Sequence, residues 1–280
     1  MPTARANDVN LYYEQQGSGE PLILIPYLAA DQACYAFQVG DYAKHFTCIS
    51  VDPRGAGQSD KPDMPYSTEQ FADDMAAFMQ AIGVESAHVW GLSLGAAVGM
   101  WLAAKHPEKV RTLSLHSAWP KTDPYLATVV ETWRIMAKSL QNVHDVIIDG
   151  IFPWCFTPGL YASKPDYVKS LADFVRSRPL QPVDAFMRES QAVIEHDCLA
   201  GLGRITAPTL ITFGRFDMCT STRFADPLSK GIKDSQVHVF EDCSHAPIYE
   251  NVQDFNQVTL AFLQQHVGDQ ARPKTELSRT

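Results

Sequence analysis

The chain has 280 residues, of which 45% are hydrophobic and 20% charged, and its formal net charge is −9 at pH 7. This length fits one large α/β domain with an insertion, or two small domains, and the composition is typical of a globular protein. The negative charge and the lack of a Lys/Arg cluster argue against a nucleic-acid or anionic-membrane surface.

The cysteines and the N-terminus bear on the cellular compartment. The six cysteines are scattered without a C-x-x-C pair, which argues against a zinc knuckle or a redox motif. Most of them have apolar neighbours, which predict buried, reduced thiols. The first residues carry no apolar segment of a secretory signal, and no apolar run is long enough to span a membrane. We therefore expect a cytoplasmic protein with no membrane partner.

The first elements in chain order are strands. Alternating apolar and polar residues predict an edge strand at residues 9–14. Continuous apolar runs at 21–26 and 46–52 predict strands buried on both faces of a parallel sheet. The loop at 52–60 is dense in Gly, Pro and Asp, so we expect tight turns there.

Helices and strands then alternate. An amphipathic helix is predicted over residues 67–83, with Thr68 as its N-cap. A short buried strand follows at 86–90, then an Ala- and Leu-rich helix at 94–104 and another strand at 110–116. This alternation predicts a doubly wound parallel sheet.

The pattern changes from Trp119 to about Cys198. No strand signal appears there, prolines interrupt several helix-length segments, and aromatic residues are frequent. We interpret this stretch as a helical cap inserted between two strands of the core.

The sheet resumes after the cap, with strands predicted at 209–214 and 236–240 and a closing helix at about 252–266. The polar C-terminal residues carry no apolar period and are expected to be disordered. The predicted division is a first core part at 1–118, a cap at 119–198, a second core part at 199–267 and a disordered tail at 268–280.

Gly91-Leu92-Ser93-Leu94-Gly95 lies at the junction of a predicted strand and a predicted helix. In this context a G-x-S-x-G motif forms a nucleophile elbow, a tight turn that presents the serine hydroxyl. Side chains in place of the glycines would collide with the strand and helix, and the helix N-terminus favours negative charge. The motif also occurs by chance, so its meaning depends on its partners.

A serine nucleophile needs a base to take its proton and a third group to orient that base. Asp217 follows the strand at 209–214, and His245 follows the strand at 236–240. Both fall in loops at the carboxyl ends of parallel strands, where sites of such sheets form. The chain order Ser, Asp, His is that of the α/β-hydrolase arrangement. We therefore predict Ser93, Asp217 and His245 as the catalytic residues.

The sequence offers alternative candidates for the acid and the base. Asp217 also fits a helix cap, and the alternative acids are Asp52, Asp60, Asp226 and Asp242, of which Asp52 is better placed to order its own Gly-rich loop. Among the nine histidines, His245 alone lies in a strand-end loop in the required order. The others considered lie within strands or at a helix end: His88, His116, His238 and His106.

Four segments together carry a family resemblance: Gly91–Gly95, Asp52–Ser59, Gly214–Asp217 and Ser244–Pro247. Over residues 9–266 the chain resembles α/β-hydrolase fold proteins, and within them small-ester and lactone hydrolases such as 3-oxoadipate enol-lactonases and serine-dependent N-acyl-homoserine lactonases. The resemblance implies a mostly parallel central sheet flanked by helices, with a helical cap. It also implies a serine carboxylic ester hydrolase.

An oxyanion hole is implied at two backbone N–H groups. One belongs to Leu94, the residue after the nucleophile, and the other to the loop after the first buried parallel strand. The family usually has His-Gly-x in that loop, whereas this chain has Pro26-Tyr27-Leu28. The second donor therefore falls on Leu28. The loss of the glycine leaves the path of the loop open, and Tyr27 brings a hydroxyl near the site.

The substrate is expected to be a small molecule with an ester or lactone bond. The apolar cap predicts a pocket for a short or medium acyl chain or ring, although packing of the cap against the core explains most of its aromatic residues as well. No clustered His and carboxylate ligands and no G-x-G-x-x-G fingerprint are present, so no metal or cofactor is expected. The expected substrate contacts are Tyr27, Trp119, Phe152 and Trp154.

Three alternative functions stay open at this point. The same triad supports perhydrolysis, as in cofactor-free haloperoxidase-like relatives, and hydrolysis of a carbon–carbon bond in ring-fission products. A hydrolase-like binding protein with slow turnover is the third. Dehalogenases and epoxide hydrolases of this fold use an aspartate at the elbow, where this chain has Ser93. The sequence leaves the oligomeric state and the mobility of the cap undetermined.

Overall fold

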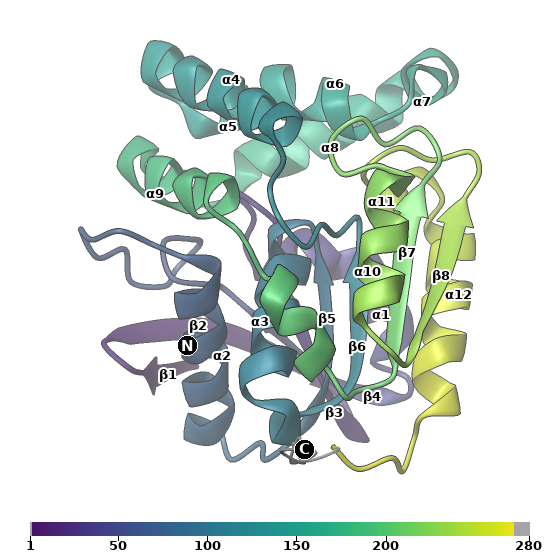
Figure 1. Cartoon of the computed structure of the whole chain (residues 1–280). Coiled ribbons are helices and arrows are strands. Elements are labelled where there is room, and N and C mark those ends of the chain that lie inside the picture. Colours follow the sequence, from purple (N-terminus) through teal and green to yellow (C-terminus); the bar gives the residue numbers. More distant parts are fainter. Residues whose placement is uncertain (1, 272–280) are drawn as a thin grey trace.

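Eight strands form a single sheet in the order β1-β2-β4-β3-β5-β6-β7-β8 in the computed structural model, which describes residues 2–271 (Figure 1). The pairs β1–β2 and β2–β4 are antiparallel and the others are parallel. The strands are β1 (Thr3–Ala6), β2 (Val9–Gly17), β3 (Glu20–Ile25), β4 (Phe46–Val51), β5 (Ala87–Leu92), β6 (Val110–His116), β7 (Thr209–Gly214) and β8 (Ser235–Phe240).

The prediction of an edge strand at residues 9–14 is wrong in its placement. β2 lies inside the sheet between β1 and β4, and β1 forms the edge. β1 has only four residues and little apolar content, so no periodicity marks it in the sequence. The strands predicted at 21–26, 46–52, 86–90, 110–116, 209–214 and 236–240 are present within a residue or two.

Helices cover both faces of the sheet. Ile23 and Ile25 of β3 point into the cluster with α2 and α3, whereas Leu22 and Leu24 point into the cluster with α1 and α12. This alternation follows from the two-residue period of a strand, and it explains why β3 is apolar throughout. The flanking helices are α1 (Ala36–Tyr42), α2 (Thr68–Ala81), α3 (Leu94–Lys105), α10 (Ala225–Gly231) and α12 (Val252–Gln265).

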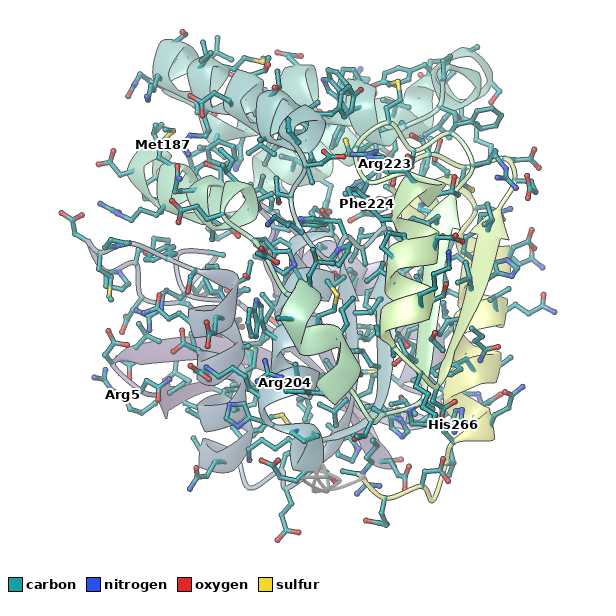
Figure 2. All side chains as sticks on the ribbon, viewed as in Figure 1. Arg5, Met187, Arg204, Arg223, Phe224 and His266 are labelled. Carbon is teal, nitrogen blue, oxygen red and sulfur yellow. The ribbon has the colours of Figure 1, made fainter. Side chains whose placement is uncertain are left out.

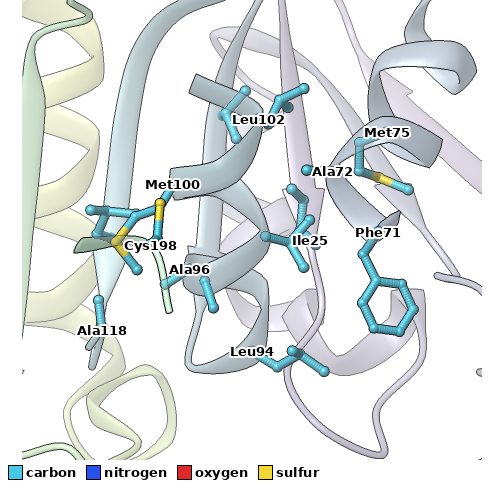
Figure 3. Close-up of a cluster of buried hydrophobic side chains, with 14 of the residues drawn as sticks. Ile25, Phe71, Ala72, Met75, Leu94, Ala96, Met100, Leu102, Ala118 and Cys198 are labelled. Atoms are coloured by element: carbon cyan, nitrogen blue, oxygen red, sulfur yellow. The ribbon is translucent and has the colours of Figure 1, made fainter. Parts of the chain in front are cut away.

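The apolar cluster that contains α2 and α3 also includes Leu94, which directly follows the serine of the predicted nucleophile elbow. Figure 3 shows Phe71 and Met75 of α2 near Ile25 of β3 and Leu94 of α3. The N-cap of α2 is Ser67 and not Thr68 as predicted, because the Ser67 side chain accepts a hydrogen bond from the Gln70 N–H at 3.0 Å.

The segment between β6 and β7 is helical and lies over the carboxyl ends of the strands (Figure 1). Its two ends pair with each other, since the Thr122 N–H donates to the His196 carbonyl at 2.9 Å and the Cys198 N–H to the Pro120 carbonyl at 2.7 Å. The helices are α4 (Pro124–Leu140), α5 (Val143–Asp145), a π-helical turn (Val146–Ile151), α6 (Phe152–Cys155), α7 (Pro158–Ser163), α8 (Pro165–Ser177) and α9 (Val183–Ile194).

Arg223 joins this helical segment to the core. Its guanidinium donates to the Asp123 carboxylate at 2.9 Å and to the Cys219 carbonyl at 2.6 Å. Asp123 is the N-cap of α4, and Figure 2 shows Arg223 just below the cap helices. The start of α4 is thereby held against the loop that follows β7.

All six cysteines are buried and unpaired, as predicted. Within residues 2–271, no helix combines the length and the apolar character that crossing a membrane requires. The tail prediction for residues 268–280 falls mostly outside the described residues, which end at Ala271.

Candidate active site

The turn between β5 and α3 presents Ser93 in a strained conformation. Ser93 has φ of 54° and ψ of −117°, a region that residues with a side chain rarely adopt. The Ser93 N–H donates to the His116 carbonyl at 2.8 Å, and the Ser93 carbonyl accepts from Ala96 and Ala97 at the start of α3. These bonds offset the strain and fix the turn.

The two glycines of the motif are required by close backbone contacts. A Cβ on Gly91 would lie 2.3 Å from the Gly95 carbonyl group, and a Cβ on Gly95 would lie 2.0 Å from the Ile25 carbonyl oxygen. The atoms that a Cβ would meet at these two positions belong to the backbone, so they cannot move aside as the end of a flexible side chain can. The absence of side chains at Gly91 and Gly95 therefore brings the turn directly against the end of β3.

His245 and Asp217 meet in the loops after β8 and β7. His245 Nδ1 lies 2.9 Å from Asp217 Oδ2, and both side chains are buried. Gly214 permits this approach, because a Cβ there would lie 1.9 Å from the Ser244 carbonyl oxygen. The carboxylate is in the position that orients an imidazole base and stabilises its protonated form.

The ionisation of the pair follows from its surroundings. Burial alone would lower the pKa of His245, but the charge and hydrogen bond of Asp217 outweigh it and raise that pKa to about 9. Burial would raise the pKa of Asp217, but His245 and the hydrogen bonds from Thr220 hold it below its usual value. Asp217 is therefore a charged acceptor next to a basic imidazole.

Two neighbours of Asp217 were not predicted from the sequence. The N–H groups of Cys219 and Thr220 donate to Asp217 Oδ1 at 2.7 and 2.9 Å, and Thr220 Oγ1 lies 3.0 Å from Oδ2 and 2.8 Å from the Ser117 carbonyl oxygen. An Asp side chain often accepts hydrogen bonds from backbone N–H groups two or three residues later in a turn. That local pattern is the signal available in the sequence.

The group Asp217, Cys219 and His245 also offers donor atoms within 4.8 Å of one another. The Asp217 oxygens already accept hydrogen bonds from Thr220 and Cys219, and His245 Nδ1 faces Asp217. A hydrogen bond with Cys155, together with burial, raises the pKa of the Cys219 thiol, which disfavours the thiolate that binds metals. The donor set fits a hydrogen-bonded Asp217–His245 pair better than a metal centre.

The predicted oxyanion donors lie on two adjoining segments. Leu94 is the first residue of α3, so its N–H has no partner within the helix. Leu28 belongs to the loop after β3, and within residues 2–271 its N–H donates no hydrogen bond. The close contact of Gly95 with the end of β3 brings these segments together.

A pocket opens between the core and the cap beside Ser93. Ser93, His245, Thr220 and Leu28 line it on the core side. Its other walls are mainly apolar and come largely from the cap: Leu126, Val130, Trp133, Ile147, Ile151, Phe156 and Val193. Ser93 and His245 therefore line the same mainly apolar pocket, as the polar groups of a small-molecule site do.

Three of the four expected substrate contacts line this cavity, namely Tyr27, Trp119 and Phe152. Trp154 does not line it; its side chain packs against the larger apolar cluster, and its carbonyl oxygen accepts a 3.4 Å hydrogen bond from Ser244. The expectation for Trp154 is corrected, because the cavity-facing side of α6 carries Phe152 and Cys155 instead. The sequence also did not single out Tyr249, which lines the cavity and bonds Tyr27 Oη at 2.8 Å.

The alternative acids lie in other surroundings. Asp52 accepts hydrogen bonds from the N–H groups of Gln32 and Gln58, both at 2.7 Å, so it orders its own loops as expected. Asp60 bonds Asn10, Asp226 pairs with Lys230, and Asp242 is exposed.

The alternative histidines are also engaged elsewhere. His88 bonds Thr112 and Glu20, and His116 bonds Thr212. His106 bonds Asp73, and the ring of His238 packs against that of Phe240.

The family model of the α/β hydrolase fold matches residues 15–252, and the chain belongs to this family of hydrolases. A relative from Azorhizobium caulinodans, with the provisional name carbamate hydrolase RutD, is 26% identical over 94% of this chain and 98% of its own. The 3-oxoadipate enol-lactonase 2 of Acinetobacter baylyi is 26% identical over 93% and 96%. The solved enol-lactonase of Burkholderia xenovorans has a TM-score of 0.84 at 24% identity, covering 94% and 100%, which shows the shared fold.

Proposed function

We propose that this protein is a serine hydrolase that cleaves carboxylic ester or lactone bonds of small to medium apolar acyl substrates. The observation that carries the proposal is a strained serine and an Asp-bound histidine lining one apolar cavity. The relative named as a 3-oxoadipate enol-lactonase supports an ester or lactone bond.

In the proposed acylation step, His245 Nε2 takes the Ser93 proton while Ser93 Oγ attacks the carbonyl carbon. Asp217 stabilises the imidazolium that forms, through the 2.9 Å contact with Nδ1. The oxygen of the tetrahedral intermediate accepts hydrogen bonds from the N–H groups of Leu28 and Leu94. The bond to the alcohol oxygen then breaks, and that oxygen takes the proton from His245.

Deacylation repeats these steps with water. His245 removes a proton from water, the hydroxide attacks the acyl carbon, and Ser93 leaves as it regains the proton. With a lactone, the alcohol produced in the first step stays attached to the acyl group until this second step. Water is the only co-reactant in these steps, and neither step changes an oxidation state.

The proposed role of residues 119–198 is to select the substrate. The cap supplies the apolar wall of the cavity, with Trp119 and Phe152 on it, and Tyr27 closes the core side. Burial of an acyl chain against such a wall stabilises the bound substrate in proportion to the apolar area removed from water. We also propose a cytoplasmic location, which the six unpaired cysteines support.

The proposal is tested by proton release on two substrate sets, p-nitrophenyl esters of increasing acyl length and a series of lactones, with Ser93→Ala as the control. We expect hydrolysis of one or both sets that is lost in Ser93→Ala. A higher kcat/KM for lactones assigns a lactonase, and a higher value for short linear esters assigns a carboxylesterase. Peroxide-dependent halide oxidation in place of hydrolysis would assign perhydrolysis, and no reaction above the Ser93→Ala background would leave a binding protein.

A further inference from the structure

Glu189 is a carboxylate of the cap that contacts the loop after β3. It lies on α9 and has no exposed surface. Its Oε2 atom accepts the Ala29 N–H at 3.2 Å and a Gln181 Nε2 hydrogen at 2.8 Å. Gln181 Nε2 also donates to the Gly55 carbonyl oxygen at 2.9 Å. Glu189 thus connects the cap with two loops of the core.

The loop that Glu189 contacts is a strained turn. The Ala30 N–H donates to the Tyr27 carbonyl at 3.1 Å, and Ala29 has φ of 62°. A positive φ at the third residue is the mark of a type II turn, a position that favours glycine. With alanine there, the type I turn is favoured, in which the peptide between Leu28 and Ala29 is turned over. A contact outside the turn must therefore stabilise the positive φ of Ala29.

Building on the serine hydrolase function proposed above, we propose that Glu189 is a positioning residue for the oxyanion loop. By accepting the Ala29 N–H, Glu189 holds the Tyr27–Ala30 turn in its left-handed form. In the opposite orientation, the Ala29 N–H would lose its Glu189 acceptor. Leu28, which this turn holds in place, lines the same cavity as Ser93, so loss of the turn would displace the proposed oxyanion donor.

A buried carboxyl is a poor choice for packing alone. Burial outweighs the hydrogen bonds from Gln181 and Ala29 and raises the pKa of Glu189 to about 7. Within residues 2–271, the Oε1 atom has no hydrogen-bond partner. An apolar side chain of similar size would avoid both costs, so a specific contact accounts for the carboxyl better than packing. Oε2 accepts the Ala29 N–H whether or not the carboxyl is ionised.

The test combines the removal of Glu189 with a substitution that relieves the strain at Ala29. In Glu189→Leu we expect kcat to fall by about 10- to 100-fold with KM within about threefold, because a contact of the transition state is displaced. Glu189→Gln keeps an acceptor oxygen and should stay within about threefold of the wild-type kcat. Adding Ala29→Gly to Glu189→Leu should restore most of the lost kcat, since glycine adopts positive φ without help.

Ala30→Gly in the Glu189→Leu background is the matched control, because Ala30 does not have a positive φ and glycine there should restore nothing. The inference fails if Glu189→Leu keeps the wild-type kcat, or if both glycine variants restore it equally. Hydrogen exchange of the Ala29 and Ala30 amides gives a readout without substrate. It should quicken in Glu189→Leu and not in Glu189→Gln, and equal exchange would also overturn the inference. If the proposed hydrolase function is itself wrong, the wild-type protein should turn over substrate no faster than Ser93→Ala.

Discussion

The core and the cap meet at one cavity but are built in different ways. On the core side, Asp217 accepts hydrogen bonds from two backbone N–H groups, and Gly95 and Gly214 lie against backbone carbonyls with no room for a Cβ. On the cap side, helices of different lengths and a π-helical turn present mainly apolar side chains. Proton transfer depends on fixed atomic positions, whereas selection of an acyl group needs a volume of suitable shape.

Because the core side supplies the proposed reacting groups, substitutions there should lower kcat. Ser93→Ala removes the proposed nucleophile and should lower kcat by about 10⁴- to 10⁶-fold while the fold is kept. The measurement is steady-state hydrolysis of a p-nitrophenyl ester, with the melting temperature as a check on folding. Labelling by a fluorophosphonate should be lost in the same variant. Residual hydrolysis within tenfold of wild type would assign the chemistry to another residue.

Asp217→Asn should have the next largest effect. The amide cannot stabilise the imidazolium, and its NH2 group favours the wrong tautomer of His245, so kcat should fall by about 10³- to 10⁴-fold. Because Asp217 raises the pKa of His245 against the effect of burial, the variant should have a lower pKa there. A base acts only when neutral, so kcat/KM falls as the pH drops through this pKa.

The acid limb of the pH profile should therefore move to lower pH in Asp217→Asn, by at least about one unit. Asp242→Asn is the matched control, because Asp242 is next to the histidine loop in sequence but exposed. An unchanged acid limb in Asp217→Asn, or an equal shift in the control, would separate Asp217 from the base.

The core side was also the part that the sequence predicted well. The parallel strands were predicted within a residue or two, and Ser93, Asp217 and His245 each follow the end of one of them, so the sheet itself brings their loops to one edge. Thr220 was not predicted because its role depends on a turn between β7 and α10 that carries no periodic pattern. β1 was missed because four residues are too few to show a period.

The cap was predicted only as a helical insertion. Its proline-broken helices can pack in several ways, and the sequence does not say which aromatic rings face the cavity. Trp154 was expected there and packs elsewhere, whereas Phe152, two residues earlier, does line the cavity. The sequence does not indicate a buried role for Glu189, because an acidic residue in an amphipathic helix is usually exposed.

The free energy of unfolding should depend on pH through Glu189, which lies between the core and the cap. Its folded-state pKa is about 7, above the ordinary value of 4.5, because of burial. Between these values the folded state keeps a proton that the unfolded chain releases, so the free energy of unfolding falls as the pH rises. The loss should be at most about 3 kcal/mol, from 1.36 kcal/mol per pKa unit, and should be absent in Glu189→Gln.

Urea titrations at pH 5 and pH 8 measure this difference. Asp52, whose pKa burial raises to about 6, contributes in the same direction, so the comparison of wild type with Glu189→Gln isolates Glu189. Asp226→Asn alters an exposed carboxyl and should leave the pH dependence unchanged. Equal pH dependence in wild type and Glu189→Gln would contradict a protonated carboxyl between the two regions.

The smallest expected effect is on the cap wall, and it should change selection without changing the chemistry. Val130 of α4 is buried and lines the cavity, so Val130→Phe should take up space needed by a long acyl chain. We expect kcat/KM for p-nitrophenyl octanoate to fall about tenfold and that for the acetate to stay within twofold. Ile135→Phe, on the same helix but 58% exposed, is the control and should change neither value. If the acetate and octanoate rates fall equally in Val130→Phe, the cap contributes to the positions of the reacting groups, and the division between fixed core and selecting cap is wrong.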